Sequence, residues 1–361
     1  MKFKAKTKEL VDALQISTSI VRDNVVIPIY REVKFELQLA NLLLTSSDIQ
    51  NTLIKEIEVE GEQDGVICID GKLLLSVLRT LSDPTISMEL DGKRMKLISL
   101  GGVYEFAVSD PKDYPKLPKM DEVSSFDIDA EVLSDGIAKT LFAVSDSQSE
   151  SIGNLLLRME GNSVFIVGCD TPRLVEFNSQ SDAEHNFSLL LNKKSANLLK
   201  QFLVSGTVTF QYNKRFLMTQ VPGVTIYTLL SEGTFPDYKR IIPLTPPHES
   251  LVDRISLLSA IKRLIILANA STHYVVLQFS PNAITVRTED VDYNRAAKEV
   301  VDAQYSGETL DIGFNGKLLV DVLSAIDTEN VSVHTTDAVR PVIFKPEGKS
   351  DYTGLVATYN L

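Results

Sequence analysis

Apolar residues recur along the chain with two periods, one helical and one strand-like, and these periods alternate in a fixed order. The helical period predicts three amphipathic helices, over Thr7 to Ile20, Ala130 to Val144 and Asp253 to Ala268. Second helices are predicted about 60 residues further along, over Asp70 to Leu81, Asn192 to Leu203 and Asn315 to Ile326. Alternating patterns predict strands between and after them, as in Glu32 to Leu39, Asn154 to Met159, Tyr274 to Phe279, Val208 to Tyr212 and Val331 to Thr335.

The second helices carry an internal repeat. Residues 70–81 read DGKLLLSVLRTL and residues 315–326 read NGKLLVDVLSAI, so six of twelve positions are identical. Residues 192–203 are a diverged third copy, in which Lys193 and Lys200 fall on Lys72 and Arg79. The Asp or Asn before the first and last apolar runs is a typical helix N-cap. The spacing of about 120 residues predicts three copies of one α+β unit.

Two proline-containing segments separate the three units. Tyr114-Pro115 and Phe235-Pro236 lead into residues 116–119 and 243–247, which we interpret as linkers. We therefore expect domains at about 1–120, 121–245 and 246–361. Each domain should be α+β, with two helices and roughly eight short antiparallel strands.

The composition is that of a globular protein. With 44% hydrophobic and 23% charged residues among 361, the chain can form sizeable cores. No apolar run approaches the roughly 18 residues that a membrane span needs, and residues 1–6 do not resemble a secretory signal. The sequence therefore predicts a soluble, cytoplasmic protein.

Charge is distributed unevenly along the chain. The net charge is −12, yet the six helix segments with their flanks together carry +6, counted over residues 6–22, 70–81, 130–145, 192–203, 253–268 and 315–326. Basic residues gathered on helices suggest a face that meets a polyanion, although charge alone leaves a simple solvated face equally open. Interleaved aromatic residues are lacking, so we expect any nucleic-acid contact to be with phosphates and indifferent to sequence.

No residue pattern supports catalysis, a metal or a cofactor. The two cysteines lie far apart in apolar stretches and are interpreted as reduced core thiols. Ser259 and Lys262 match the Ser-x-x-Lys spacing of serine acyl-enzymes, but they lie inside an apolar-periodic helix without KTG or SDN partner segments. The histidines are scattered without metal-ligand spacing: His185, His248, His273 and His334. We expect no enzyme, and a hydrolase using Ser259 and Lys262 is the weakest alternative.

Several segments in order along the whole chain resemble one family. They are MKF at residues 1–3, IPI at 27–29, TFPDYKRIIP at 234–243 and IGFN at 312–315. Together with the threefold repeat, they resemble the bacterial DNA polymerase III beta subunit, the replicative sliding clamp. The resemblance implies a non-catalytic processivity factor, in which two chains join head to tail into a ring of six pseudo-equivalent domains around duplex DNA.

The resemblance also implies roles for helix cations and for a ring joint. Positions similar to the family's DNA-facing residues are Lys72, Arg79, Lys193 and Lys200, and the charge count adds Lys262 and Arg263. The sequence departs from relatives near two further expected DNA contacts, at Asn24 and Glu150. The joint is expected to place Phe106 and Val108 on one sheet edge and Ile266 and Leu267 near the other side.

A pocket for short hydrophobic peptide segments is implied between the second and third domains. Its motif reads DTPRL at residues 170–174 where the family usually has DGHRL, and the tail reads ATYNL in place of MPMRL. The pocket residues carried over by motif are Ile152, Cys169, Thr171, Arg173, Leu174, Pro236, Arg240, Ile241, Leu318, Leu355, Ala357, Thr358, Tyr359 and Leu361.

The implied partners are a second copy of the chain, duplex DNA without sequence preference, the clamp loader, the polymerase III catalytic subunit and other clamp-binding polymerases or repair proteins. No membrane partner is expected. The competing class is a three-domain scaffold that binds proteins but not DNA. Loading onto nicked circular DNA separates these two hypotheses.

Overall fold

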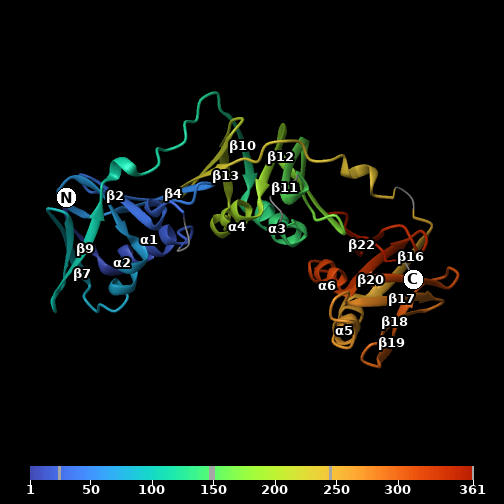
Figure 1. Cartoon of the computed structure of the whole chain (residues 1–361). Helices are drawn as coiled ribbons and strands as arrows, with labels where there is room; N and C mark the ends of the chain where they lie inside the picture. The colour runs from blue at the N-terminus through green and yellow to red at the C-terminus, as the bar shows by residue number, and fades with distance from the viewer. Residues whose placement is uncertain (23–25, 146–150, 244–245, 360–361) are drawn as a thin grey trace. The chain divides into compact units, whose positions relative to one another are not determined.

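The computed structural model describes residues 1–22, 26–145, 151–243 and 246–359 (Figure 1). Each of the six predicted helices is confirmed, and each observed helix lies inside its predicted span. They are α1 (Thr7–Thr18), α2 (Gly71–Leu78), α3 (Ala130–Thr140), α4 (Lys193–Phe202), α5 (Arg254–Ile265) and α6 (Gly316–Ser324).

Short polar side chains start five of these helices. The side chain before each one accepts a backbone N–H of the first turn, from Asp70, Asp129, Asn192, Asp253 and Asn315. In the repeated motif the next residue is glycine because α2 and α6 lie close to their neighbours. A Cβ on Gly71 would lie 2.4 Å from Val33, and one on Gly316 would lie 2.7 Å from Ile265.

Contacts within the chain group its residues into two compact units. The first unit is Met1–Ile128 with Thr207–Leu230, and the second is Asp129–Gly206 with Ser231–Leu361. Each unit therefore combines one end of the chain with part of the middle segment. The division into three domains remains a prediction from the repeat.

One thirteen-stranded sheet forms the first unit. Strands β4 and β15 join the N-terminal and middle segments, with Leu53 opposite Ile226 in an antiparallel pair. The sheet order is β10 (Ser124–Asp129), β13 (Thr207–Tyr212), β14 (Phe216–Val221), β15 (Val224–Leu229), β4 (Asn51–Glu58), β3 (Asn41–Ser47), β2 (Glu32–Gln38), β6 (Gly65–Asp70), β9 (Val103–Ser109), β8 (Arg94–Ile98), β7 (Thr85–Asp91), β1 (Lys2–Lys6) and β5 (Glu60–Gln63).

Helices α1 and α2 pack against each other in this unit (Figure 1). Their apolar faces meet the sheet in one core that includes Leu10, Leu14, Leu74, Leu78 and Phe35, all fully buried or nearly so. The helical spacing of these leucines therefore marks the core face, as the sequence predicted.

A ten-stranded sheet forms the second unit. Strands β12 and β23 join the middle and C-terminal segments, with Leu174 opposite Leu355. The sheet order is β11 (Asn154–Cys169), β12 (Arg173–Asn192), β23 (Tyr352–Val356), β22 (Val342–Pro346), β21 (Asn330–Thr335), β16 (His248–Asp253), β19 (Arg295–Gln304), β18 (Ala283–Asp290), β17 (Tyr274–Ser280) and β20 (Leu310–Asn315). The middle segment has fewer strands than the other two because β11 and β12 are 16 and 20 residues long.

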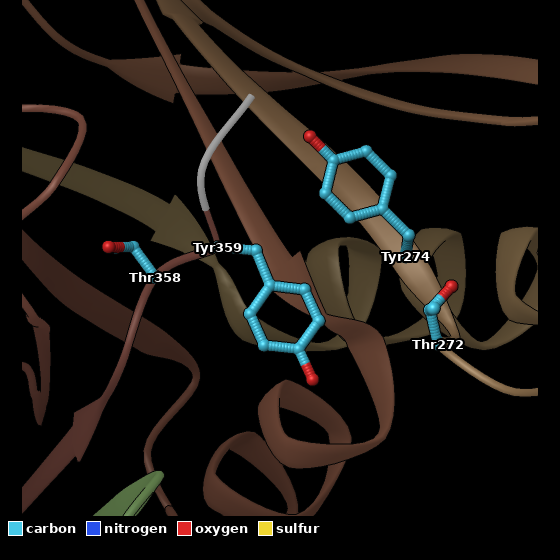
Figure 2. Close-up of a pocket in the computed structure, with 4 residues that line it drawn as sticks. All are labelled: Thr272, Tyr274, Thr358 and Tyr359. Atoms are coloured by element: carbon cyan, nitrogen blue, oxygen red, sulfur yellow. The ribbon is translucent and has the colours of Figure 1, made fainter.

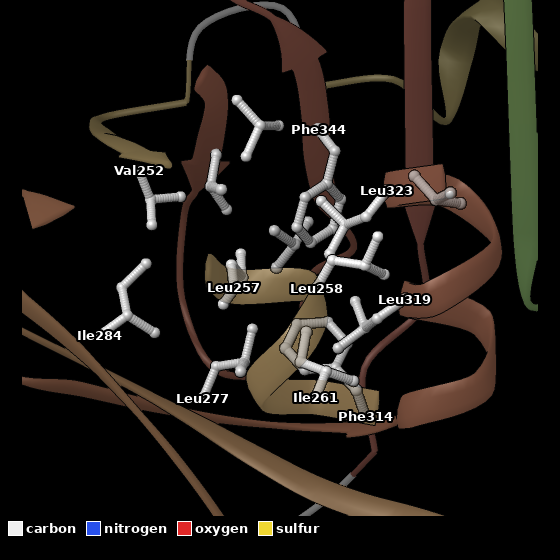
Figure 3. Close-up of a cluster of buried hydrophobic side chains, with 14 of the residues drawn as sticks. Val252, Leu257, Leu258, Ile261, Leu277, Ile284, Phe314, Leu319, Leu323 and Phe344 are labelled. Atoms are coloured by element: carbon white, nitrogen blue, oxygen red, sulfur yellow. The ribbon is translucent and has the colours of Figure 1, made fainter. Parts of the chain in front are cut away.

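The core of the second unit lies around α5 and α6 (Figure 3). Leu257 and Ile261 of α5, Leu319 and Leu323 of α6, and Phe314 of β20 are completely buried there. Burying side chains of this size stabilises the fold by roughly 1.5 to 3 kcal/mol each, so this core fixes the place of β20 and of the nearby C-terminal tail.

Two classes of site have no support in the described part of the chain. No three His, Cys, Asp or Glu side chains within it gather as metal ligands. No helix within it is long and apolar enough to cross a membrane. Both cysteines are free and buried, as expected, and burial raises the pKa of the Cys68 thiol to about 12.

Candidate functional site

The cations predicted to face DNA lie on or at the ends of helices. Lys72 is half-buried on α2, and Arg79 is exposed at the C-terminal end of that helix. One Arg79 Nη donates to the side-chain oxygen of Gln15 on α1 at 2.9 Å. Because the neutral Gln15 orients Arg79 without matching its charge, the guanidinium can still attract a phosphate.

Helix α4 carries Lys193 and Lys200 in a half-buried environment. The Nζ of Lys193 donates to the backbone carbonyl of Val144 at 3.0 Å, which draws this side chain toward the end of the α3 region. Lys200 makes no ion pair with any described residue. Both cations therefore lie on the helix that the repeat aligns with α2.

The two predicted DNA contacts on helix α5 differ in their surroundings. Lys262 is exposed, whereas Arg263 forms an ion pair with Glu299 of β19, and its Nε lies 3.1 Å from the same carboxylate. Arg263 is therefore the least suited of the six to a phosphate contact. Ser259 is half-buried on the same helix, and no hydrogen bond joins it to Lys262 in the described structure, which leaves the hydrolase alternative without geometry.

The predicted ring joint involves two strands that are paired along only part of one side. Within the described chain, Val103 to Ala107 of β9 pair with β8, while β6 takes only Val108 and Ser109. Strand β19 repeats this pattern, since β18 pairs along most of it and β16 takes only its last two residues. Both strands therefore present unpaired backbone groups along one side.

Side chains near these strands differ from the prediction in one respect. Phe106 is only 6% exposed and belongs to the core of the first unit, so it supports β9 from within instead of offering a large contact surface. Val108 is half-buried. The exposed apolar residue at the start of β9 is Val103, which the sequence did not single out.

Ile266 and Leu267, predicted for the other side of the joint, are exposed. They follow directly after α5, and their exposed fractions are 75% and 38%. Val300 on β19 adds an exposed apolar side chain that the sequence did not single out. Single solvated apolar residues are common on protein surfaces, so their exposure alone does not identify an interface.

Three strands bring the core of the predicted peptide pocket together. Cys169 of β11 lies opposite Leu174 of β12, and Leu174 lies opposite Leu355 of β23. These side chains form one buried cluster with Tyr238 and Leu190, and all are less than 9% exposed. The three predicted apolar residues are therefore neighbours, although the sequence separates Leu174 from Leu355 by most of the second half of the chain.

Arg173 lies beside this cluster but is committed to internal contacts. Its Nη2 donates to Asp170 at 2.6 Å and to the Phe142 carbonyl at 3.1 Å, and its Nη1 pairs with Asp321 of α6. Burial opposes the charged form, but the hydrogen bonds and charges of Asp170 and Asp321 outweigh it and raise the pKa of Arg173. Most of its N–H groups are thus used, so Arg173 stabilises the pocket and offers little to a ligand.

Tyr238 belongs to the same buried cluster, and the sequence did not single it out. It is 2% exposed, and its hydroxyl donates to the Glu176 carboxylate of β12. Burial, and then this hydrogen bond, raise the pKa of Tyr238 well above its ordinary value. Phe235 and Ile242 pack against the same cluster, so the apolar residues of the TFPDYKRIIP motif could have indicated that this segment docks on the sheet.

The remaining predicted pocket residues are less closely joined. Pro236, Arg240 and Ile241 are exposed, and Arg240 pairs with Asp237 at 2.7 Å. Leu318 packs against the core of α5 and α6 instead of the apolar cluster. Ile152 is half-buried within a short 3-10 helix, Ser151–Gly153. Leu361, Asn24 and Glu150 lie outside the described residues.

Residues after β23 border a pocket. The backbone N–H of Ala357 donates to the Pro172 carbonyl at 2.8 Å, which places the tail beside the DTPRL turn. Thr358 and Tyr359 then line a pocket of about 450 Å³ together with Thr272 and Tyr274 (Figure 2). The pocket wall is formed by hydroxyl groups and aromatic rings without a charged side chain, which suits an uncharged ligand segment.

Thr171 lies in the tight turn between β11 and β12. The Asp170 N–H donates to the Arg173 carbonyl at 3.1 Å, and Thr171 has φ +79°. Ile49, in the corresponding turn between β3 and β4, also has φ +79°. Two β-branched residues therefore occupy a left-handed conformation that glycine adopts freely.

Replacing Thr171 with glycine is expected to raise the free energy of unfolding by about 1 kcal/mol, because relief of left-handed strain exceeds the entropy of the freer unfolded chain. Urea unfolding measures the change. The control is Thr207→Gly, at an exposed β13 residue outside the positive-φ set, which should lose stability. A Thr171→Gly variant that loses as much stability as the control would contradict the strain.

Comparison with protein families and curated proteins gives one consistent answer. The DNA polymerase III beta subunit N-terminal domain matches residues 1–118, and its C-terminal domain matches residues 239–359, together about two thirds of the chain. The beta sliding clamp of Chlamydia muridarum is 24% identical over 355 residues, 97% of each chain. That of Staphylococcus aureus is 24% identical over 371 residues, 99% of this chain and 98% of the relative.

Solved structures share the fold along the full length. A sliding clamp from Pseudomonas aeruginosa bound to griselimycin superposes with a TM-score of 0.95 at 22% identity, covering 100% of both chains. A clamp from Bacillus subtilis gives 0.95 at 22% identity, covering 100% of this chain and 99% of that one. The chain therefore belongs to the DNA polymerase III beta subunit family, the non-catalytic sliding clamps of the polymerase holoenzyme.

Proposed function

We propose that two copies of this chain join head to tail into a ring that encircles duplex DNA and tethers DNA-processing proteins. The observation that carries the ring is the pair of half-open strands, β9 and β19. Since these strands belong to opposite ends of the sequence, β9 of one protomer can pair with β19 of its partner at both joints. Such a heterologous contact between chains produces a closed ring when the rotation that relates one chain to the next brings the last chain back to the first.

Side chains beside the strands support this pairing. Val103 and Tyr104 are exposed on β9. Ile266 and Leu267 are exposed directly after α5, and the ion pair between Arg263 and Glu299 joins that helix to β19. A joint between them removes apolar surface from water at the same time as it satisfies strand edges. Phe106 then stabilises β9 from its own core.

The helix cations suit a ring that encloses DNA without binding it tightly. Lys72, Arg79, Lys193, Lys200 and Lys262 can meet phosphates as weak, salt-screened contacts without reading bases. Ring closure, and not affinity, then prevents escape from the DNA. Such a protein works in the cytoplasm, at the replication machinery, with the clamp loader as the factor that places it on DNA.

The decisive experiment compares circular and linear DNA. After loading by a clamp loader onto nicked circular plasmid, the ring should remain bound at a salt concentration that removes ordinary phosphate contacts. It should leave when the plasmid is cut once. Equal retention on both forms would refute encirclement and favour the protein-binding scaffold.

Reversing the charges of Lys193 and Lys200 to glutamate is expected to lower loading about five- to tenfold, because phosphate attraction on α4 becomes repulsion. Loading is measured as protein retained per plasmid. The matched control reverses Lys112 and Lys214, which are exposed outside the α-helices. If both double variants load alike, net charge and not the α4 face decides loading.

We propose that short apolar peptide segments of the polymerase III catalytic subunit, other polymerases, repair proteins and the clamp loader bind in a groove over the apolar cluster of Leu174 and Leu355. Its support is the convergence of three strands and the DYKR segment on one apolar cluster. Such a groove buries little area, so affinities in the micromolar range, roughly −8 kcal/mol, are expected. The scaffold hypothesis shares this groove, and only the DNA experiment separates the two.

A further inference from the structure

Each of residues 357–359, which follow β23, makes a hydrogen bond to another part of the chain. Beyond the Ala357 contact, the Thr358 hydroxyl donates to the Val339 carbonyl at 2.7 Å. The Tyr359 N–H donates to the Gly313 carbonyl at 2.8 Å, in an isolated antiparallel bridge to β20. Because β20 is the last strand of its sheet, this bridge uses an edge that would otherwise be open at Gly313.

Gly313 is required for this arrangement. A Cβ added there would lie 2.8 Å from the Tyr274 ring and 2.9 Å from the Tyr359 carbonyl oxygen. The second neighbour is backbone, so it cannot turn aside as a flexible side chain would. Any larger residue at position 313 must push the tail away from β20.

Tyr274 also contacts the tail, through its aromatic ring. Its ring is stacked with that of Tyr359, with centroids 6.4 Å apart and planes within 7° (Figure 2). The two rings are also walls of the pocket of about 450 Å³. The pocket therefore has its present form only while the tail stays in contact with β20 and Tyr274.

We propose that Gly313 and Tyr274 form a seat that positions the C-terminal tail as one wall of the peptide groove. This inference rests on the proposed peptide-binding function. Thr358 and Tyr359 follow closely on Leu355 of the apolar cluster, so the tail connects that cluster along the chain with the pocket at Tyr274. Because the tail is already ordered, peptide binding does not have to include the entropy cost of ordering it. The ligand that fits this site is an uncharged, extended peptide.

The test uses the full chain and a Gln-Leu-Xaa-Leu-Phe peptide as the probe. Gly313→Ala is expected to weaken peptide binding about tenfold and to speed hydrogen exchange of the Tyr359 amide. Gly101→Ala is the control, since a Cβ there meets nothing within 4 Å. Tyr274→Ala should weaken binding about three- to tenfold, and Tyr274→Phe should restore it because the ring stack remains.

The outcomes separate the seat from the groove itself. A wild-type chain that does not bind the peptide would refute the groove and with it the role of the seat. A wild-type chain that binds, alongside a Gly313→Ala variant of equal affinity, would refute the seat alone. Loss of binding in Tyr274→Phe as severe as in Tyr274→Ala would also overturn the stacking argument.

Discussion

Replacing Ile266 and Leu267 with alanine is expected to convert the dimer into a monomer of 40.0 kDa. Both side chains are solvated within one chain, at 75% and 38% exposure, so truncation leaves the fold of the protomer intact. In the proposed interface both side chains would be buried, and losing them together would cost about 4 kcal/mol, or roughly a thousandfold in dimer affinity. Light scattering at micromolar concentration reads the mass directly.

The control is a pair of apolar residues with similar exposure elsewhere. Leu73 of α2 and Ile255 of α5 are 54% and 53% exposed, and neither lies on the half-open strands. Leu73→Ala with Ile255→Ala should therefore remain a dimer. The ring model fails if the wild type has the mass of one chain, or if both double variants dissociate equally. The monomeric variant should also leave circular and linear DNA at the same rate.

Deleting residues 358–361 is expected to abolish binding of the Gln-Leu-Xaa-Leu-Phe peptide, a loss of at least about a hundredfold. Thr358 and Tyr359 form half of the pocket lining, whereas β23 ends at Val356 and keeps its pairing with β12 and β22. The truncated chain should thus fold and dimerise normally. Isothermal titration with the peptide measures the loss.

A second variant guards against an indirect effect of the deletion. Leu174→Ala removes apolar contact from the buried cluster and leaves the tail in place, so this variant should also bind the peptide more weakly. Light scattering must still show a dimer for both proteins. Unchanged titration by both would mean that the peptide site lies elsewhere on the chain.

Local sequence signals were sufficient for the helices and for the repeat. Apolar spacing identifies the buried face of a helix, and short polar residues such as Asp70 and Asn315 satisfy the N–H groups of its first turn. These effects depend on neighbours a few residues apart, so the chain order alone carries them. The same holds for the glycines after these caps, which mark where helices approach other elements closely.

Whether an individual charged residue remains available to a ligand depends on contacts between residues far apart in the sequence. Arg173 resembles a ligand contact in its motif, but Asp321, 148 residues away, binds its guanidinium. Arg263 counts as a helix cation, but Glu299 of β19 neutralises it. Pair electrostatics of this kind depend on distance in space, which a linear pattern does not contain.

By itself, the sequence determined the order of helices and strands and the threefold repeat, because local spacing and hydrophobicity dictate these. Only the tertiary structure decided that Phe106 is core, that β9 and β19 are half open, and that Tyr359 is seated on Gly313 and Tyr274. Strand register and side-chain packing make those decisions, and both require the whole sheet to be assembled.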